Sequence, residues 1–186
     1  GKGRFIDNLN IAGQAYMHIV RSYSANAKIK IKNPESVKKM SGVLEVFTGI
    51  NLMQDGILPI PITLNFKRPG GSPAHSDPYH ALCQGKVRFV GQPLAVVVAD
   101  SREQAIQASE SLEVEYEEYP AVTDLLHANK PESPLVCNDL PDNIAASETL
   151  GNQQELEKIF SNAHHVTRME LINNRLVGTP LEPRGL

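Results

Sequence analysis

Alternating hydrophobic and polar positions predict short β-strands in the first two-thirds of the chain. Residues 27–32 carry isoleucine and lysine at alternate positions, and residues 113–119 alternate glutamate with Val114 and Tyr116. A period of two is typical of strands that bury one face. Residues 94–99 instead form a continuous valine-rich run, which predicts a strand buried on both faces. Further strands are expected at 15–21, 43–48 and 86–90.

Three helices are predicted from capping residues and from apolar residues at helical spacing. Asn33 and Pro34 suit the N-cap and the first position of a helix over 34–40. Ser101 and Gln104 have the spacing of a capping box at the start of a second helix. A third helix is expected over 153–163. Val37 and Met40 of the first helix are expected to face inward. Apolar residues share one face in each of the other two helices: Ala105, Ala108 and Leu112 in the second, and Leu156, Ile159, Phe160 and Ala163 in the third.

Two strand–helix–strand passages, 27–48 and 94–119, determine the predicted fold class. Their helices are short, and their flanking strands alternate, so helices packed on a mixed sheet are favoured over a doubly wound sheet. We therefore predict an α+β fold. Neither passage contains the glycine-rich loop of the common nucleotide-binding folds, so nucleotide binding of those classes is not expected.

Proline-rich stretches separate these patterns. Residues 53–85 hold five prolines and are expected to form a loop over the surface, with at best an edge strand at 58–64. Residues 121–150 are expected to be a connector. A strand over 164–176 is predicted to follow the third helix. Since one helix and one strand cannot bury a core, we expect them to begin a second domain, and the apolar C-terminal end favours a chain cut within that domain.

Composition excludes several classes of function. The chain has 186 residues, of which 41% are hydrophobic and 21% charged, as in ordinary globular proteins. A net charge of -3, 5% aromatic residues and no tryptophan argue against a nucleic-acid partner. No apolar run is long enough for a membrane span. Two cysteines predict a reducing, cytoplasmic location and are too few to hold an iron–sulfur cluster.

One loop contains several side chains that could bind a transition metal. They are His75, Asp77, His80 and Cys83. Their spacing matches no metal-binding motif, so a solvated loop is favoured over a metal site. The pair His164–His165 lies in a predicted strand, where neighbours point to opposite faces and cannot share one metal ion.

Acidic and thiol side chains offer weaker candidates for catalysis. The acidic run consists of Glu113, Glu115, Glu117 and Glu118, and it is expected to keep one strand face solvated rather than to act as an acid/base pair. Neither Cys83 nor Cys137 has a basic sequence neighbour that would lower its pKa. From the residues alone, we expect no catalytic, cofactor-binding or metal-binding residue in this chain.

Six ordered segments resemble a known enzyme family. They are GKGRFIDNLNIAG at 1–13, VRSYSANAKI at 20–29, SGVLEVFTG at 41–49, VRFVGQPLAVVVADSREQA at 87–105, VEYEEYPAV at 114–122 and ELINNRLVGTPLEPRG at 170–185. Together they resemble the N-terminal part of the large subunit of the molybdenum hydroxylases. That family includes carbon monoxide dehydrogenase, aldehyde oxidase and xanthine dehydrogenase. Residues 53–84 depart from the resemblance.

The resemblance implies a division of the chain and a role for it. Residues 1–120 would form an α/β hammerhead domain, 121–150 a connector, and 151–186 the first elements of a truncated molybdenum-binding domain. The parent would be an oxidoreductase with molybdopterin in its large subunit and with FAD and iron–sulfur clusters on partner subunits of a hetero-oligomer. The residues that hold the cofactor and the catalytic glutamate would lie beyond this chain, and Glu182 would not be that glutamate.

Two functions remain open at this point. The first is a fragment of a molybdopterin-dependent hydroxylase large subunit, inactive alone, with a scaffolding and subunit-contact role. The second is a free-standing module that binds a protein or a ligand on a hammerhead-like fold. The substrate of the parent, whether carbon monoxide, an aldehyde or an N-heterocycle, is not set by these residues.

Overall fold

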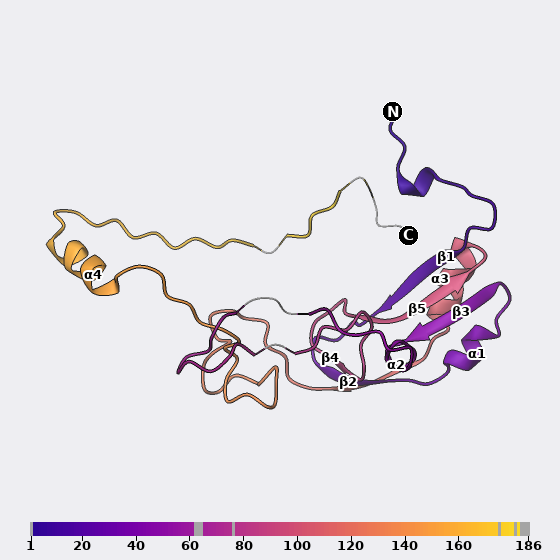
Figure 1. Cartoon of the computed structure of the whole chain (residues 1–186), viewed down its shortest axis with the longest axis horizontal. Coiled ribbons are helices and arrows are strands. Elements are labelled where there is room, and N and C mark those ends of the chain that lie inside the picture. Colours follow the sequence, from indigo (N-terminus) through magenta and orange to yellow (C-terminus); the bar gives the residue numbers. More distant parts are fainter. Residues whose placement is uncertain (1, 62–64, 76, 175, 181, 183–186) are drawn as a thin grey trace. The chain divides into compact units, whose positions relative to one another are not determined.

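The computed structural model describes residues 2–61, 65–75, 77–174, 176–180 and 182. The chain divides into two units. One unit is Gly13–Ser147, and the other combines Gly1–Ala12 with Glu148–Leu186. Figure 1 follows the chain through both units.

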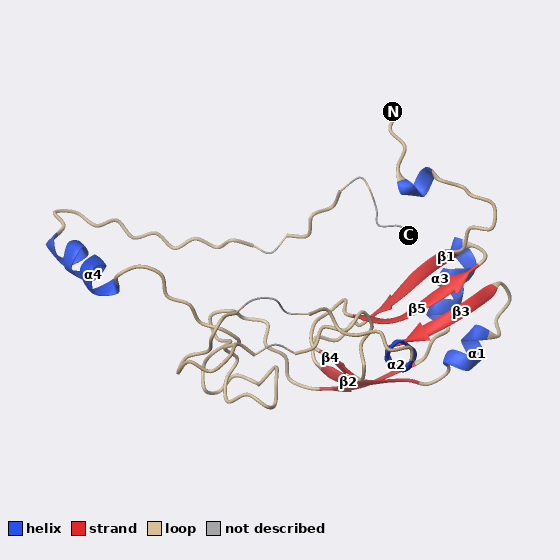
Figure 2. Cartoon of the chain, in the orientation of Figure 1, coloured by secondary structure: helices blue, strands red, loops and turns tan. Residues whose placement is uncertain are grey.

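The larger unit contains a three-stranded sheet with a buried central strand. β5 (Pro93–Ala99) lies between β1 (Tyr16–Arg21) and β3 (Val43–Thr48), and both pairings are antiparallel. The valine-rich run predicted to be buried on both faces is this central strand. Helix α3 (Arg102–Glu110) packs against β1 and β5, while the short helix α1 (Pro34–Lys38) packs against β3 (Figure 2).

A second sheet of the same unit is formed by the alternating strands. β2 (Ala27–Ile31) lies between β4 (Lys86–Val87) and β6 (Val114–Glu118), again with antiparallel pairings. The apolar positions of β2 and β6 contact the core and their lysines and glutamates are exposed, as the alternation predicts. The expected strand over 86–90 is shortened to two residues.

The two helical crossovers connect different sheets. α1 joins β2 of the second sheet to β3 of the first, and α3 joins β5 of the first to β6 of the second. A crossover between two sheets does not require the parallel pairing that a crossover within one sheet produces. The predicted α+β class is therefore confirmed, but every strand pairing of the described residues is antiparallel, so the expected mixed sheet is replaced by two antiparallel sheets.

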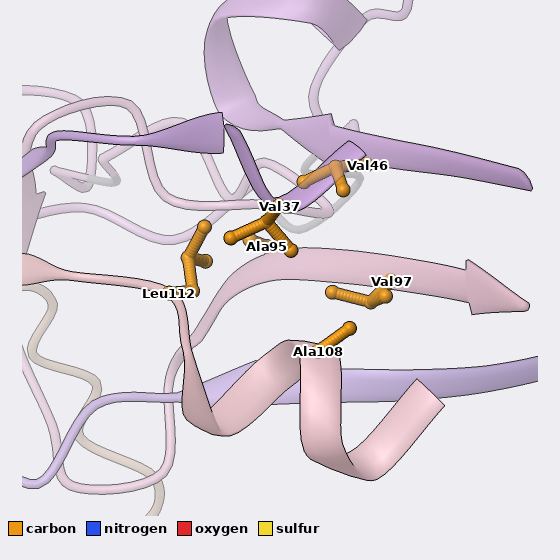
Figure 3. Packing of buried hydrophobic residues seen from close by; sticks show 6 residues of the cluster. All are labelled: Val37, Val46, Ala95, Val97, Ala108 and Leu112. Carbon is orange, nitrogen blue, oxygen red and sulfur yellow. The ribbon is translucent and has the colours of Figure 1, made fainter. Parts of the chain in front are cut away.

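The main core lies between the first sheet and its helices. Its buried side chains are Val37, Val46, Ala95, Val97, Ala108 and Leu112. In Figure 3, Ala108 points from α3 toward Val97 of β5. Burying a side chain of the size of Val97 contributes about 1.5–3 kcal/mol, so this cluster is a principal source of stability. Met40, which was predicted to face inward, remains 36% exposed because α1 ends at Lys38.

Capping side chains position the two crossover helices in different ways. Ser101 accepts a hydrogen bond from the backbone N–H of Gln104 at 3.2 Å, as the predicted cap of α3 requires. Asn33 precedes α1 but makes no side-chain cap. Its Nδ2 donates to the Ser111 carbonyl at 3.0 Å, and its Oδ1 accepts from the Glu113 N–H at 2.8 Å. Asn33 thus joins α1 to the segment that leads into β6.

Most described residues of the irregular region before β4 are exposed, as expected of a loop over the surface, but Leu82 and Cys83 near its end are buried. The region begins with helix α2 (Gly49–Gln54), which was not predicted. Cys83, near the end of the region, is 6% exposed and packs with Ala27, Val87 and Leu94. A Cβ atom on Gly49 would lie 2.2 Å from the Cys83 carbonyl oxygen, so only glycine permits this close approach. The possible edge strand at 58–64 lies partly outside the described residues.

The smaller unit contains the predicted third helix as α4 (Gln153–Asn162), and the Asn152 side chain caps it. None of its residues is buried. The predicted strand over 164–176 was wrong for its described residues, none of which is in a strand. A strand needs a hydrogen-bonding neighbour, and these residues have no strand to pair with. In the same unit, the Glu182 carboxylate accepts a hydrogen bond from the Ile6 N–H at 2.9 Å.

No described helix combines the length and the hydrophobicity that a bilayer crossing requires.

Candidate functional site

The irregular loop before β4 contacts the segment after β6 within the larger unit. Arg68 Nε donates to the Ile144 carbonyl at 2.8 Å, and the Arg68 guanidinium also pairs with the Asp142 carboxylate. The His75 N–H donates to the Ala145 carbonyl at 2.9 Å. In Figure 1 the two segments, one magenta and one orange, lie side by side. The segment predicted to be a connector is therefore held against the loop by specific contacts.

This contact brings four potential metal ligands together. The residues are His75, Asp77, Cys137 and Asp139, and one donor atom from each lies within 4.8 Å of the others. His75 Nε2 is 3.5 Å from Asp77 Oδ1, and His75 Nδ1 is 3.9 Å from Asp139 Oδ2. Cys137 Sγ donates to Asp77 Oδ2 at 3.0 Å. A nitrogen, a sulfur and two carboxylates thus converge on one point.

The arginine of the neighbouring segment borders this cluster. Arg88 Nε lies 2.5 Å from Asp77 Oδ2. Both Arg88 Nε and His75 Nε2 are buried atoms that face Asp77 without a well-directed hydrogen bond. The imidazole is only 20% exposed, whereas the Asp139 side chain is 70% exposed, so the cluster is closed on one side and open on the other.

Electrostatics keep the carboxylate and the thiol of this cluster in different protonation states. Burial favours the neutral form of Asp77, but the Cys137 hydrogen bond, the Arg88 charge and the neighbouring His75 imidazole outweigh it and hold the pKa of Asp77 below its ordinary value. Burial raises the pKa of the Cys137 thiol, and the hydrogen bond to Asp77 raises it further. In the absence of another ligand, Cys137 is therefore a neutral thiol that donates to a charged carboxylate.

Only two of the four metal-ligand candidates suggested by the sequence enter this cluster. His75 and Asp77 do, but His80 Nδ1 contacts Gln84 Nε2 at 3.0 Å instead. Cys83 is in the second core cluster, where burial raises the pKa of its thiol. Sequence reasoning missed Cys137 and Asp139 as partners. No local spacing could reveal them, because Cys137 lies 60 residues from Asp77 in the chain.

The remaining sequence candidates do not assemble into a site. Glu115 and Glu117 lie on the exposed face of β6, where they pair with Lys32 at 2.6 Å and Lys28 at 3.9 Å across the sheet. This is the solvated strand face that the alternation predicts. The pair His164–His165 is exposed, and His165 Nε2 contacts the Thr167 hydroxyl at 3.1 Å. Neither histidine belongs to a metal-ligand group among the residues that were placed.

A cavity of about 310 Å³ lies beside the second sheet. Its lining includes Asn26, Lys28, Lys86, Tyr119, Pro120 and Leu135. Both lysines are already engaged, Lys28 with Glu117 and Lys86 with the Val136 carbonyl at 3.3 Å. The cavity therefore offers mainly apolar surface and amide groups.

Comparisons with known proteins identify the larger part of the chain. The family model described as "Aldehyde oxidase and xanthine dehydrogenase, a/b hammerhead domain" matches residues 1–120. The carbon monoxide dehydrogenase large chain of Hydrogenophaga pseudoflava is 28% identical over 197 aligned residues, which cover 100% of this chain. That alignment covers 23% of the relative, so the chain spans about a quarter of the length of the curated proteins it matches.

Solved structures agree with the sequence matches. Quinoline 2-oxidoreductase from Pseudomonas putida 86 superposes with a TM-score of 0.69 and 30% identity, covering 90% of this chain and 20% of that chain. A Cu,Mo-CO dehydrogenase in its carbon monoxide reduced state gives a TM-score of 0.67 and 26% identity, covering 88% of this chain and 21% of that chain. The similarity thus extends across the folded unit and covers a small part of each larger protein.

Proposed function

Because the chain belongs to the aldehyde oxidase and xanthine dehydrogenase a/b hammerhead domain family, we propose that it is the N-terminal part of a molybdenum hydroxylase large subunit. In this proposal residues 1–120 are the hammerhead domain, 121–150 the connector and 151–186 the first elements of the molybdenum-binding domain. Its role is to form part of the wall of the large subunit and to contact partner subunits. The observation that carries the proposal is a match over the full chain to relatives about four times as long.

The chain's own cavities do not suit a molybdopterin cofactor. Sites for small organic ligands commonly enclose roughly 300–1,000 Å³. One cavity of the folded unit, about 310 Å³, is at the lower end of that range, and another, about 140 Å³, lies below it. Their linings are mainly prolines, aliphatic residues and engaged lysines. We therefore place the cofactor and the catalytic residues in the remaining polypeptide, and we expect this chain alone to be inactive.

Helix α4 supports a role as part of a larger polypeptide. Its apolar side chains Leu156, Ile159 and Phe160 are 51%, 58% and 59% exposed. An amphipathic helix gains most of its stability by burying such a face, and a ten-residue helix is marginal in water without it. The proposed occupant of this face is the rest of the molybdenum-binding domain. A free-standing module, the alternative function, gives this face no partner.

Partner subunits and location complete the proposal. Relatives are named as large chains or large subunits, which is consistent with a multi-subunit complex. We propose that the FAD and iron–sulfur groups are bound by separate subunits. The two free cysteines, Cys83 and Cys137, support a cytoplasmic location. We propose that the residues that select the substrate lie in the rest of the large subunit, outside this chain.

The proposal is tested by expressing the gene's reading frame beyond codon 186 beside the 186-residue chain. We expect molybdenum, measured by elemental analysis, and dye-linked oxidation of carbon monoxide, aldehydes or N-heterocycles only with the longer product. Ile159→Glu should reduce the yield of assembled large subunit by about tenfold or more, because it places a charge in the proposed interface. Lys158→Glu, a neighbouring charge change, is the matched control. Stoichiometric molybdenum and turnover on the short chain alone would contradict the proposal.

A further inference from the structure

We propose that His75, Asp77, Cys137 and Asp139 form a binding site for one divalent transition-metal ion, with zinc as the best match. The ion would fasten the irregular loop that carries His75 and Asp77 to the segment that carries Cys137 and Asp139. This inference is independent of the proposed scaffold function. It revises the expectation from the sequence that the chain contains no metal ligand.

The positions of the donor atoms suit a compact four-ligand site. All four lie within 4.8 Å of one another. Zinc bonds of about 2.0–2.3 Å in tetrahedral geometry place neighbouring ligand atoms roughly 3.5 Å apart. The donor set therefore has to contract by about 1 Å, which side-chain rotation can supply. Asp139, at 70% side-chain exposure, is the ligand with the most freedom to move inward.

The chemistry of the donors selects the class of metal. One thiol sulfur and one imidazole nitrogen accompany two carboxylates. Magnesium and calcium prefer oxygen ligands alone, whereas zinc, cobalt and related ions accept sulfur, nitrogen and oxygen together. His75 Nε2 is a buried nitrogen without a well-directed hydrogen bond, so it can bind a metal without breaking an existing one. Soft and borderline donors thus favour zinc over the abundant hard cations.

Charge is balanced when the ion is bound. A divalent ion and the Arg88 guanidinium carry three positive charges, which match the two carboxylates and one thiolate. Binding forms a sulfur–metal bond and releases the Cys137 thiol proton to solvent, with no change of oxidation state. The Arg88 guanidinium pairs with Oδ2 of Asp77, while Oδ1 of the same carboxylate lies 3.5 Å from His75 Nε2. Arg88 is not a proposed ligand itself, but its ion pair with Asp77 would orient that carboxylate toward the metal ion.

The position of the site gives the ion a structural role. The segments that it would join are separated by 60 residues of chain between Asp77 and Cys137. Closing a loop of this length costs entropy, and an ion that binds only the closed form stabilises it by mass action. The region concerned has few regular elements of its own, and the β pairing of its described residues is limited to the isolated bridges Ile60–Tyr79 and Lys67–Pro73.

Cobalt(II) provides a direct test on the metal-free 186-residue chain. Titration should saturate at one equivalent per chain and produce a near-ultraviolet thiolate-to-cobalt charge-transfer band together with visible bands of a four-coordinate ion. Zinc should then displace cobalt and abolish both sets of bands. Zinc should also raise the midpoint of thermal unfolding. Absence of saturable binding of either ion at micromolar concentrations would overturn the proposal.

Single variants assign the ligands. Cys137→Ser should remove the charge-transfer band and weaken binding by at least about tenfold. Cys83→Ser is the matched control, since it removes the other thiol and should leave the band in place. Asp139→Asn changes an exposed side chain, so the fold should persist while affinity falls severalfold. A band that survives in Cys137→Ser, or unchanged affinity in Asp139→Asn with an intact circular dichroism spectrum, would refute the assignment.

Discussion

Helices α3 and α4 have similar lengths and the same kind of side-chain cap, yet they differ completely in burial. α3 packs alanines onto the first sheet, and Ala105 and Ala108 are almost fully buried. α4 carries larger apolar side chains but buries none of them. The comparison shows that amphipathic spacing and a cap suffice to predict a helix, while the stability that the helix confers depends on whether the structure supplies a surface for its apolar face.

The largest expected difference in unfolding free energy is between a leucine in the sheet that α3 covers and a leucine in α4. Leu94 in β5 is 0% exposed, whereas Leu156 in α4 is 51% exposed. Leu94→Ala should lower the free energy of unfolding by about 2–5 kcal/mol, since it leaves a cavity in the core. Leu156→Ala should change it by less than about 0.5 kcal/mol in the chain alone. Urea denaturation of the 186-residue chain measures both, and equal effects would show that α4 is buried in solution.

Removing the side-chain caps of α3 and α4 should give a smaller difference in stability, again with the larger loss at the packed helix α3. Ser101→Ala should cost about 1 kcal/mol of unfolding free energy, because it leaves the Gln104 N–H of a packed helix without its acceptor. Asn152→Ala removes the equivalent hydrogen bond to the Glu155 N–H, which measures 3.1 Å. It should leave the main unfolding transition in place and only reduce helix content. Circular dichroism in urea separates these results, and a shifted midpoint in Asn152→Ala would contradict the distinction.

The smallest effect is expected from a surface ion pair of the larger unit. The hydrogen bond from Lys38, aided by the Val46 N–H, holds the pKa of Glu45 below its ordinary value. A lowered carboxyl pKa contributes stability at pH values above the unfolded pKa of about 4.3, and the contribution is lost as pH falls through the folded pKa. Glu45→Gln should therefore flatten the acid side of the stability profile slightly. Added salt should shrink the difference from wild type, and an unchanged profile would show that the pair is inert.

Much of the local structure followed from the sequence, because its causes lie within a few residues. The alternation in 27–32 and in 113–119 corresponds to β2 and β6, and Ser101 caps α3 as predicted. The ordered motifs also led to the hammerhead family, which the match over residues 1–120 confirms. For the strands and the cap, the period of the side chains and the hydrogen-bonding capacity of a single residue were sufficient.

What the tertiary structure decided involves residues that are distant in the chain. The separation of the strands into two antiparallel sheets depends on which sheet each crossover reaches, and no local pattern encodes that choice. Residues 164–176 have strand-like composition, but those described found no partner and formed no strand. His75 and Asp77 meet Cys137 and Asp139 only because the loop and the segment after β6 fold against each other. Periodicity therefore determined which face each strand and helix could bury, whereas long-range packing determined what each face meets.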